Sequence, residues 1–111
     1  MRARWFIFFS LSLTLTACTG DSEKTTQTVL GPNVDRGRRL YLLNCTSCHN
    51  RDPSKQGATG PAVKGSSEAL LEAKILRGSY PPGYVPKRRS SSMQRYPYLK
   101  KAIPDIAAYL R

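Results

Sequence analysis

One five-residue motif constrains this chain more than any other feature of its sequence. Residues 45–49 are Cys-Thr-Ser-Cys-His, so two cysteines lie three positions apart and a histidine directly follows the second. On a single turn this spacing brings the two thiols close together, and the imidazole projects from the same place. Cys45 and Cys48 can then hold the edge of a porphyrin through two thioether bonds while His49 binds its iron from one face. This is the attachment signature of a c-type haem.

The rest of the sequence argues against other roles for these two cysteines. A zinc site needs about four ligands, whereas the chain has one histidine and no second cysteine pair. A thioredoxin-like redox pair needs a βαβ context, which the sequence lacks. A structural disulfide between Cys45 and Cys48 would leave His49 unexplained. We therefore predict one haem c, covalently bound through Cys45 and Cys48.

A six-coordinate haem iron needs a second axial ligand, and the sequence offers few candidates. His49 is the only histidine, and Met93 is the only methionine besides Met1. Met93 could instead fill a gap in a core, but its neighbours are polar and show no apolar periodicity. It lies within residues 79–98, where four prolines argue against a helix or a central strand. We predict that this stretch folds over one haem face and that Met93 is the second iron ligand.

The first part of the chain is typical of an export signal. Two arginines precede a short apolar run that ends in small residues, as in a secretory signal. The alternative is an N-terminal membrane anchor, but the run is short for a membrane span. Residues 15–18, Leu-Thr-Ala-Cys, resemble a bacterial lipobox, in which the cysteine is acylated. We expect a lipoprotein signal peptide over residues 1–17 and a lipid anchor on Cys18, with a free cysteine beside an ordinary cleavage site as the alternative. The protein would then lie on the periplasmic side of a bacterial membrane. The resemblance to bacterial lipoproteins also implies that Thr19, rather than Asp, after the cysteine favours the outer membrane where two membranes exist.

The remaining chain divides into a tether and one small domain. Residues 18–32 are polar and lack periodicity, which predicts a flexible tether between the lipid and a domain over residues 33–111. Much of the 40% apolar content is lost with the leader, and a domain this small usually needs a staple. Three cysteines cannot all pair with one another. A bound porphyrin would supply the missing core.

Three segments of the domain carry helical signals. Residues 33–44 have Asn33 as an N-cap, and Gly37 in mid-helix suggests that another helix crosses closely there. Residues 67–77 follow a serine cap and stop at a glycine, and residues 102–111 have a proline that only a first turn tolerates. The positions expected to face the core are Val34, Gly37, Tyr41, Leu70, Leu71, Ile75, Ile103, Ile106, Ala107 and Leu110.

Several features together resemble the class I monohaem cytochromes c, over roughly residues 33–111. These features are the cysteine–histidine motif of residues 45–49, a preceding helix with Gly37 and Tyr41, and the pair Gly60-Pro61 that follows the motif. One late methionine, Met93, and a final helix that includes residues 105–111 complete the pattern. The resemblance implies an all-α fold with three to four short helices around a covalently bound haem. It also implies that the first and last helices cross near Gly37 and Tyr109, and that the Pro61 carbonyl accepts a hydrogen bond from His49.

Two positions depart from the pattern of that family. A proline often follows the ligand methionine, whereas Gln94 follows Met93 here, so the loop is expected to be looser. The last helix begins with Lys100 and Lys101, where acidic residues would suit the helix dipole better. The first departure bears on the strength of the methionine ligand, and the second on surface charge.

The chain is strongly basic, with 18 Lys and Arg against 7 Asp and Glu and a net charge of +11. Three consecutive basic residues, 87–89, lie just before Met93. Such a run is usually a solvated face, and export excludes nucleic acid as a partner. Two interpretations remain, docking of a redox protein with an acidic surface or contact with anionic lipid headgroups. We favour docking, because steered and transient encounters suit a carrier.

These inferences lead to one functional prediction and three alternatives. We predict a monomeric, membrane-tethered carrier of single electrons that is not an enzyme and binds one haem c with His49 and Met93 as axial ligands. It could instead be a permanent haem subunit of a larger periplasmic or membrane oxidoreductase. From a different class comes a gas or peroxide sensor in which Met93 dissociates, and Gln94 is the one feature in its favour. A structural lipoprotein without haem is the last alternative.

Overall fold

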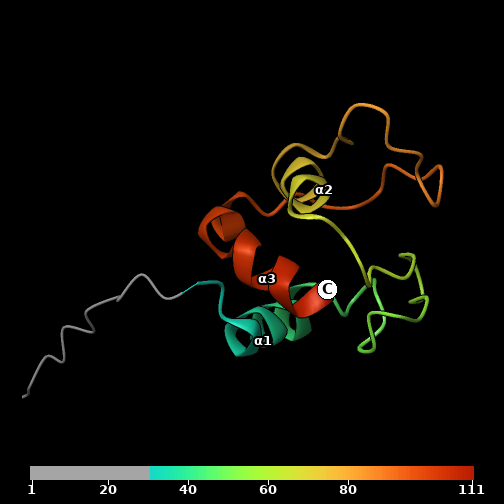
Figure 1. The fold of residues 1–111 in the computed structure, drawn as a ribbon. Coiled ribbons are helices and arrows are strands. Elements are labelled where there is room, and N and C mark those ends of the chain that lie inside the picture. The colour runs from blue at the N-terminus through green and yellow to red at the C-terminus, as the bar shows by residue number, and fades with distance from the viewer. Residues whose placement is uncertain (1–30) are drawn as a thin grey trace, which may run out of the picture.

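The computed structural model describes residues 31–111. The expected signal peptide, the lipid anchor at Cys18 and nearly all of the tether lie outside the described residues. The elements, in chain order, are α1 (Val34–Asn44), α2 (Glu68–Glu72), the π-helical η1 (Ala73–Arg77), the 3-10 helix η2 (Pro97–Ala102) and α3 (Ile103–Leu110). Residues 31–111 contain no strand, so the predicted all-α fold is confirmed (Figure 1). None of the helices in this range has the length and apolar character needed to cross a membrane.

Helix α1 begins as the sequence predicts. The side chain of Asn33 caps it by accepting a hydrogen bond from the Arg36 N–H at 2.8 Å. Tyr41 is buried, but Val34 is not, with half of its surface exposed. The prediction that Val34 faces the core was wrong, because the part of the fold that faces this first turn is polar. Asp105 of α3 lies there and binds Asn33 and Arg36.

Helices α1 and α3 are in backbone contact where Gly37 lies. A Cβ atom at Gly37 would come within 2.5 Å of the Asp105 carbonyl carbon and within 3.0 Å of the Ile106 nitrogen. The close crossing inferred from this glycine is therefore confirmed. Its centre lies opposite Asp105, one turn before Tyr109, whose ring packs against that of Tyr41 with centroids 5.5 Å apart.

The segment predicted as one helix over residues 67–77 consists of two parts. Its ends are as expected: the Ser67 hydroxyl accepts from the Leu70 N–H, and Gly78 ends the helix with φ of 66°. Its second half, η1, widens into a π-helix, in which the Gly78 N–H reaches back five residues to the Ala73 carbonyl. The Ser79 N–H binds the same carbonyl at 3.1 Å and closes the end of the helix. The carbonyl of Ile75 is thereby left to accept a hydrogen bond from a distant part of the chain.

The stretch expected to be irregular over residues 79–98 ends earlier than predicted. Pro97 occupies the first turn of η2, where a missing N–H costs nothing, so it does not exclude a helix there. Leu99 of the same segment is buried. Lys100 and Lys101 lie in the last turn of η2 rather than at the start of α3. The C-terminal end of a helix carries partial negative charge, so cations are favourable there.

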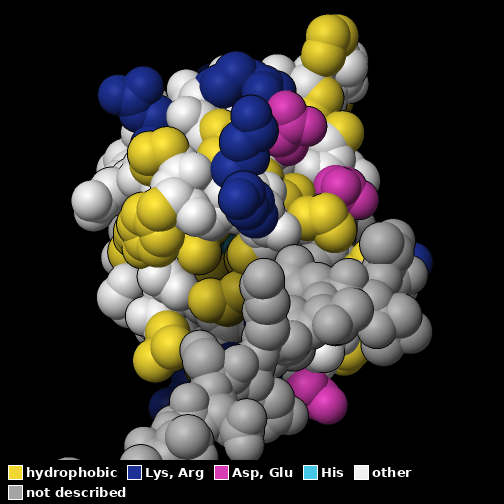
Figure 2. All heavy atoms as spheres, turned by 90° about the vertical axis from the view of Figure 1, so that its left-hand side faces the viewer, with side chains coloured by type: hydrophobic (Ala, Val, Ile, Leu, Met, Phe, Trp, Pro, Cys, Tyr) yellow, Lys and Arg dark blue, Asp and Glu magenta, His cyan; other side chains and the backbone are white. Residues whose placement is uncertain are grey.

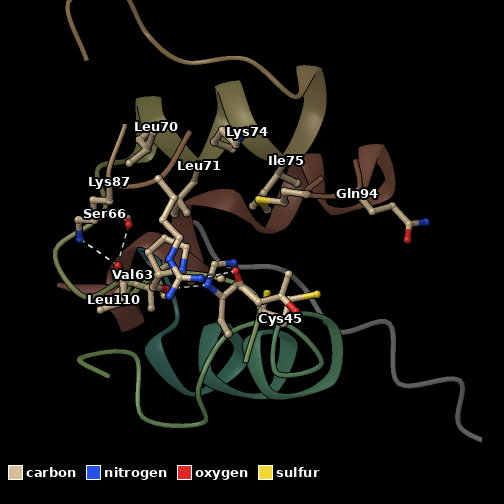
Figure 3. Close-up of a pocket in the computed structure, with 18 of the residues that line it drawn as sticks. Cys45, Val63, Ser66, Leu70, Leu71, Lys74, Ile75, Lys87, Gln94 and Leu110 are labelled. Carbon is tan, nitrogen blue, oxygen red and sulfur yellow. Dashed lines mark hydrogen bonds between the residues drawn. The ribbon is translucent and has the colours of Figure 1, made fainter. Parts of the chain in front are cut away.

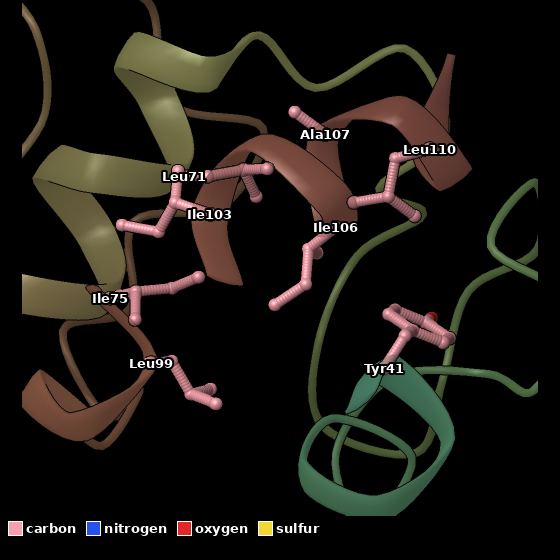
Figure 4. Close-up of a cluster of buried hydrophobic side chains, with 8 residues drawn as sticks. All are labelled: Tyr41, Leu71, Ile75, Leu99, Ile103, Ile106, Ala107 and Leu110. Atoms are coloured by element: carbon pink, nitrogen blue, oxygen red, sulfur yellow. The ribbon is translucent and has the colours of Figure 1, made fainter. Parts of the chain in front are cut away.

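The core is small and centred on α3 (Figure 4). Side chains of α3 lie between those of α2 and η1 on one side and Tyr41 of α1 on the other, as Figure 1 also shows for the helices themselves. The cluster consists of Tyr41, Leu71, Ile75, Leu99, Ile103, Ile106, Ala107 and Leu110. Leu70, expected in the core, is only half-buried. It lies at a pocket that the core leaves open.

Candidate functional site

A pocket of about 290 Å³ opens directly onto the core (Figure 3). Leu71 and Ile75 extend into it from α2 and η1, and Cys45 lies opposite, at the end of α1. All six site residues predicted from the sequence line this single pocket, namely Cys45, Cys48, His49, Gly60, Pro61 and Met93. Residues from 45 to 93 along the chain therefore meet in one place.

The end of α1 places the cysteine–histidine motif at the pocket. Cys45 caps the helix, with its N–H bound to the Tyr41 carbonyl at 2.9 Å. The Cys45 carbonyl in turn accepts from the N–H groups of Cys48 at 3.2 Å and His49 at 2.8 Å. This turn holds the two thiols and the imidazole on one side of the chain. Cys45 is half-buried and Cys48 exposed, and both are free thiols.

The His49 ring is fixed from behind by the Gly60-Pro61 pair. A Cβ atom at Gly60 would lie 2.5 Å from Nδ1 of His49, so only glycine lets the ring pack this closely. The same Nδ1 lies 2.8 Å from the Pro61 carbonyl oxygen, the contact that the family resemblance implies. Because a carbonyl only accepts, Nδ1 must carry the proton. In the neutral tautomer with this hydrogen bond, the lone pair that can bind a metal is on Nε2.

Met93 reaches the pocket from the irregular loop of residues 79–96. Both ends of this loop are attached to η1, through the Ser79 N–H and through a 2.7 Å hydrogen bond from the Tyr96 N–H to the Ile75 carbonyl. Met93 is half-buried and packs against the edge of the core. The side chain of the following residue, Gln94, points outward (Figure 3). Met93 has no periodic apolar partners along the chain, and its burial comes from the pocket instead.

The electrostatic character of the pocket is one-sided. Lys74, Lys87 and Arg88 are among its lining residues, and none of the lining residues within 31–111 is Asp or Glu. The Lys74 ammonium lies 4.2 Å from the centre of the Tyr80 ring, which stacks on Tyr84 at a centroid distance of 5.4 Å. An apolar interior with cations at its margin suits a flat apolar ligand that carries carboxylates.

The family model named Cytochrome c matches residues 34–111. The chain belongs to the cytochrome c family. No curated protein matches it. The family carries electrons on haem, and it implies a covalent c-type haem, for which Cys45 and Cys48 have the required spacing.

The described residues of this cytochrome fit a c-type haem on structural grounds. The pocket supplies two free thiols, an imidazole nitrogen with a lone pair and a thioether. Its walls are mainly apolar, and Lys74, Lys87 and Arg88 could pair with the two carboxylates of the porphyrin. Cys45 and Cys48 hold the macrocycle, and the ring of His49 lies beside them.

The alternatives for the cysteines find no support in this cytochrome. Burial, with the nearby Cys48 adding to it, raises the pKa of the Cys45 thiol to about 11. A redox-active pair depends on a lowered pKa, because the thiolate is the reacting species. Within residues 31–111, no group of three or more His, Cys, Asp or Glu side chains is placed to hold a metal such as zinc.

Sequence reasoning placed Tyr41 in the core but missed its hydrogen bond at the site. The Tyr41 hydroxyl donates to the Asn50 carbonyl at 2.6 Å and so ties α1 to the chain just after the motif. Burial raises the pKa of Tyr41 to about 12, which keeps the phenol protonated. The roles of Tyr80 and Tyr84 were also missed, although two tyrosines in a loop otherwise rich in Pro and Ser were a signal of packing.

Proposed function

We propose that this cytochrome is a carrier of single electrons in which His49 and Met93 bind the haem iron from opposite faces. The observation that carries the proposal is that both side chains line the pocket of the two attachment cysteines. The hydrogen bond to Pro61 supports it further, because it leaves Nε2 of His49 free to bind iron. When bound, the haem supplies an iron atom that takes up and releases one electron.

The side chains around the pocket perform the remaining tasks of a carrier. The Pro61 carbonyl fixes the orientation of the His49 ring and raises its basicity as a ligand. Buried apolar residues such as Leu71 and Ile75 exclude water. The thioether of Met93 favours the reduced iron and so raises the reduction potential. With two protein ligands in place, no iron position is left for a substrate, which is the basis for proposing a carrier rather than an enzyme.

The proposal includes export and attachment to a membrane through Cys18. Cytochrome c domains are typically exported, and residues 15–18 resemble a lipobox. The polar residues that follow Cys18 would serve as a tether. An acylated cysteine carries several chains, which anchor a protein more stably than a single chain does.

We also propose that the monomeric protein docks redox partners through acidic surfaces on those partners. The net charge supports this, since it is +11 for the whole sequence and still +9 without Arg2 and Arg4 of the leader, and Lys87 and Arg88 lie at the margin of the pocket itself. Figure 2 shows one face of the molecule, on which a group of Lys and Arg side chains lies beside hydrophobic and acidic ones. A free carrier should bind such a partner transiently and lose it at high salt, whereas a permanent subunit should co-purify.

One observation favours the sensor alternative. The loop that carries Met93 has no helix or strand between residues 79 and 96, and Met93 itself is only half-buried. A ligand held this way could dissociate and admit a diatomic gas or peroxide at the iron. The two functions differ in whether Met93 stays bound.

The deciding experiment is visible absorption of the protein matured with its haem, oxidised and reduced, before and after carbon monoxide. A carrier shows the far-red band of methionine-ligated ferric iron and no response to carbon monoxide. Met93→Ala should lose the band and bind carbon monoxide, which controls for the assignment of the ligand. A wild-type spectrum that shifts with carbon monoxide would instead support the sensor, and a protein without haem would refute both.

A further inference from the structure

The loop of residues 79–96 must be held over the pocket by contacts outside itself, because it has no regular structure. Its two ends are attached to η1, as described above. Its own internal hydrogen bonds join near neighbours, such as Tyr84 to Pro81 and Ser90 to Ser92. Neither set connects the middle of the loop to the opposite wall of the pocket.

Two consecutive basic residues make that connection. Arg88 donates from Nη1 to the Thr59 carbonyl and from Nη2 to Oε1 of Gln56, both at 2.6 Å. Lys87 donates from Nζ to the Ala62 carbonyl at 2.9 Å. Figure 3 places Lys87 beside Val63, at the margin where the loop meets this wall. We call these three hydrogen bonds the clasp.

The wall that accepts the clasp is the one that positions His49. The N–H groups of Thr59 and Gly60 both bind the Cys48 carbonyl, at 3.2 and 2.8 Å. Gly60 and Pro61 contact the His49 ring. A short chain of hydrogen bonds thus runs from the cysteine–histidine motif through Thr59 to Arg88, five residues before Met93.

The chemistry of the clasp suits arginine in particular. The acceptors of Arg88 are one backbone carbonyl and one amide oxygen, so Arg88 acts through the fork of its guanidinium and not through an ion pair. Hydrogen bonds from a charged donor are shorter and stronger than those between neutral groups. A lysine at position 88 keeps the charge but cannot reach both acceptors at once in the same planar geometry.

We propose that Arg88, with Gln56 as its partner, is a positioning residue that closes the loop over the pocket and thereby holds Met93 at the iron. The role rests on the proposed ligation by Met93, but closure of the loop can be measured without it. Opening the clasp leaves the two anchors on η1 intact, so the loop should swing as a flap while the helices stay folded.

The test uses the haem-loaded protein and four variants. Arg88→Gln removes both contacts, Arg88→Lys keeps the charge, and Gln56→Ala removes one acceptor. Arg89→Gln is the matched control, because Arg89 is exposed and makes no hydrogen bond with any residue from 31 to 111. Imidazole is titrated into the ferric protein, where it competes with Met93, and the far-red band is followed. Hydrogen exchange of amides 79–96 is measured in parallel.

We expect Arg88→Gln to bind imidazole about 10-fold more tightly than the wild type, the effect of losing about 1.4 kcal/mol of closure. Arg88→Lys and Gln56→Ala should shift in the same direction by less, and Arg89→Gln should match the wild type. Exchange should accelerate in the loop but not in α1 or α3. If Arg88→Lys and Gln56→Ala both match the wild type in affinity and exchange, Arg88 acts through charge alone and the clasp is refuted.

Failure of the clasp and failure of the proposed ligation give different results. If Met93 is not a ligand, the wild type itself lacks the far-red band, whatever residue 88 is. Hydrogen exchange then decides the clasp on its own. Faster exchange of amides 79–96 in Arg88→Gln supports it, and unchanged exchange overturns it.

Discussion

Replacing Gly37 by alanine sets helix propensity against packing. In an exposed helix this change stabilises by about 1 kcal/mol, because glycine is the more flexible residue when unfolded. Here the new Cβ would lie 2.5 Å from the Asp105 carbonyl carbon, where ordinary contact begins at 3.4 Å. Helix α3 would have to retreat by about 0.9 Å, and more to clear the carbonyl oxygen, which is closer still. No rotamer change relieves the clash, because both partners are backbone.

The retreat of α3 would loosen the core on both of its sides. Overpacking of this kind costs about 1–3 kcal/mol, and a backbone clash belongs at the upper end. After the gain in propensity is subtracted, we expect Gly37→Ala to lose about 2 kcal/mol, or about 8–16 °C in Tm for a domain of this size.

Thermal unfolding of the haem-loaded protein, followed by far-ultraviolet circular dichroism, measures this loss. Arg38→Ala is the control, because Arg38 is an exposed position on the same helix, where substitutions usually change stability by less than about 0.5 kcal/mol. A Gly37→Ala protein that is as stable as the wild type, or more stable, would refute the inferred backbone contact between α1 and α3.

Three further predictions follow from the described contacts and from the leader. The hydrogen bond from Arg36, with one from the Asn33 N–H, lowers the pKa of the buried Asp105 below its ordinary 3.8. The ionised Asp105 therefore stabilises the folded protein above pH 3.8, and this stabilisation is lost as the pH falls through the lower pKa of the folded state. In acid-unfolding curves Asp105→Asn should be about 1–3 kcal/mol less stable at neutral pH and lack that acid-dependent loss, and parallel curves for the two proteins would contradict this. Gly60→Ala pushes a Cβ into the His49 ring and should reduce the yield of haem-loaded protein with a low-spin ferric spectrum, whereas a normal yield and spectrum would show that the ring can move freely. Cys18→Ser should release the protein from washed membranes with its haem spectrum unchanged, and retention on the membrane would rule out anchoring through Cys18.

Local signals in the sequence were sufficient for the parts of the fold that depend on neighbouring residues. The cap at Asn33, the stop at Gly78 and the cysteine–histidine motif each involve residues within a few positions of one another. Gly37 also predicted a long-range contact, because a glycine in mid-helix needs a reason. These features led to the helices and to the attachment site.

The contacts that the sequence could not predict are made mainly to backbone groups, which every residue has. Arg88 binds the Thr59 carbonyl 29 residues away, and every residue has a carbonyl, so nothing in the pattern marks Thr59 as its partner. The same holds for the bond from Tyr96 to Ile75, which depends on the π-helical turn of η1. Asp105 was not among the positions expected to face the core, yet it is buried, with 2% of its surface exposed, because α1 and its cap supply its partners.

Five residues of the core cluster also line the pocket, and this dual membership affects how the protein is made. They are Tyr41, Leu71, Ile75, Ile106 and Leu110. A chain that has not yet received its prosthetic group would expose one side of these residues to water, so it can complete only part of its hydrophobic burial. Attachment at Cys45 and Cys48 is then a step of folding itself. We expect the cell to distinguish finished from unfinished molecules by this exposed surface, with proteases removing those that the attachment machinery has missed.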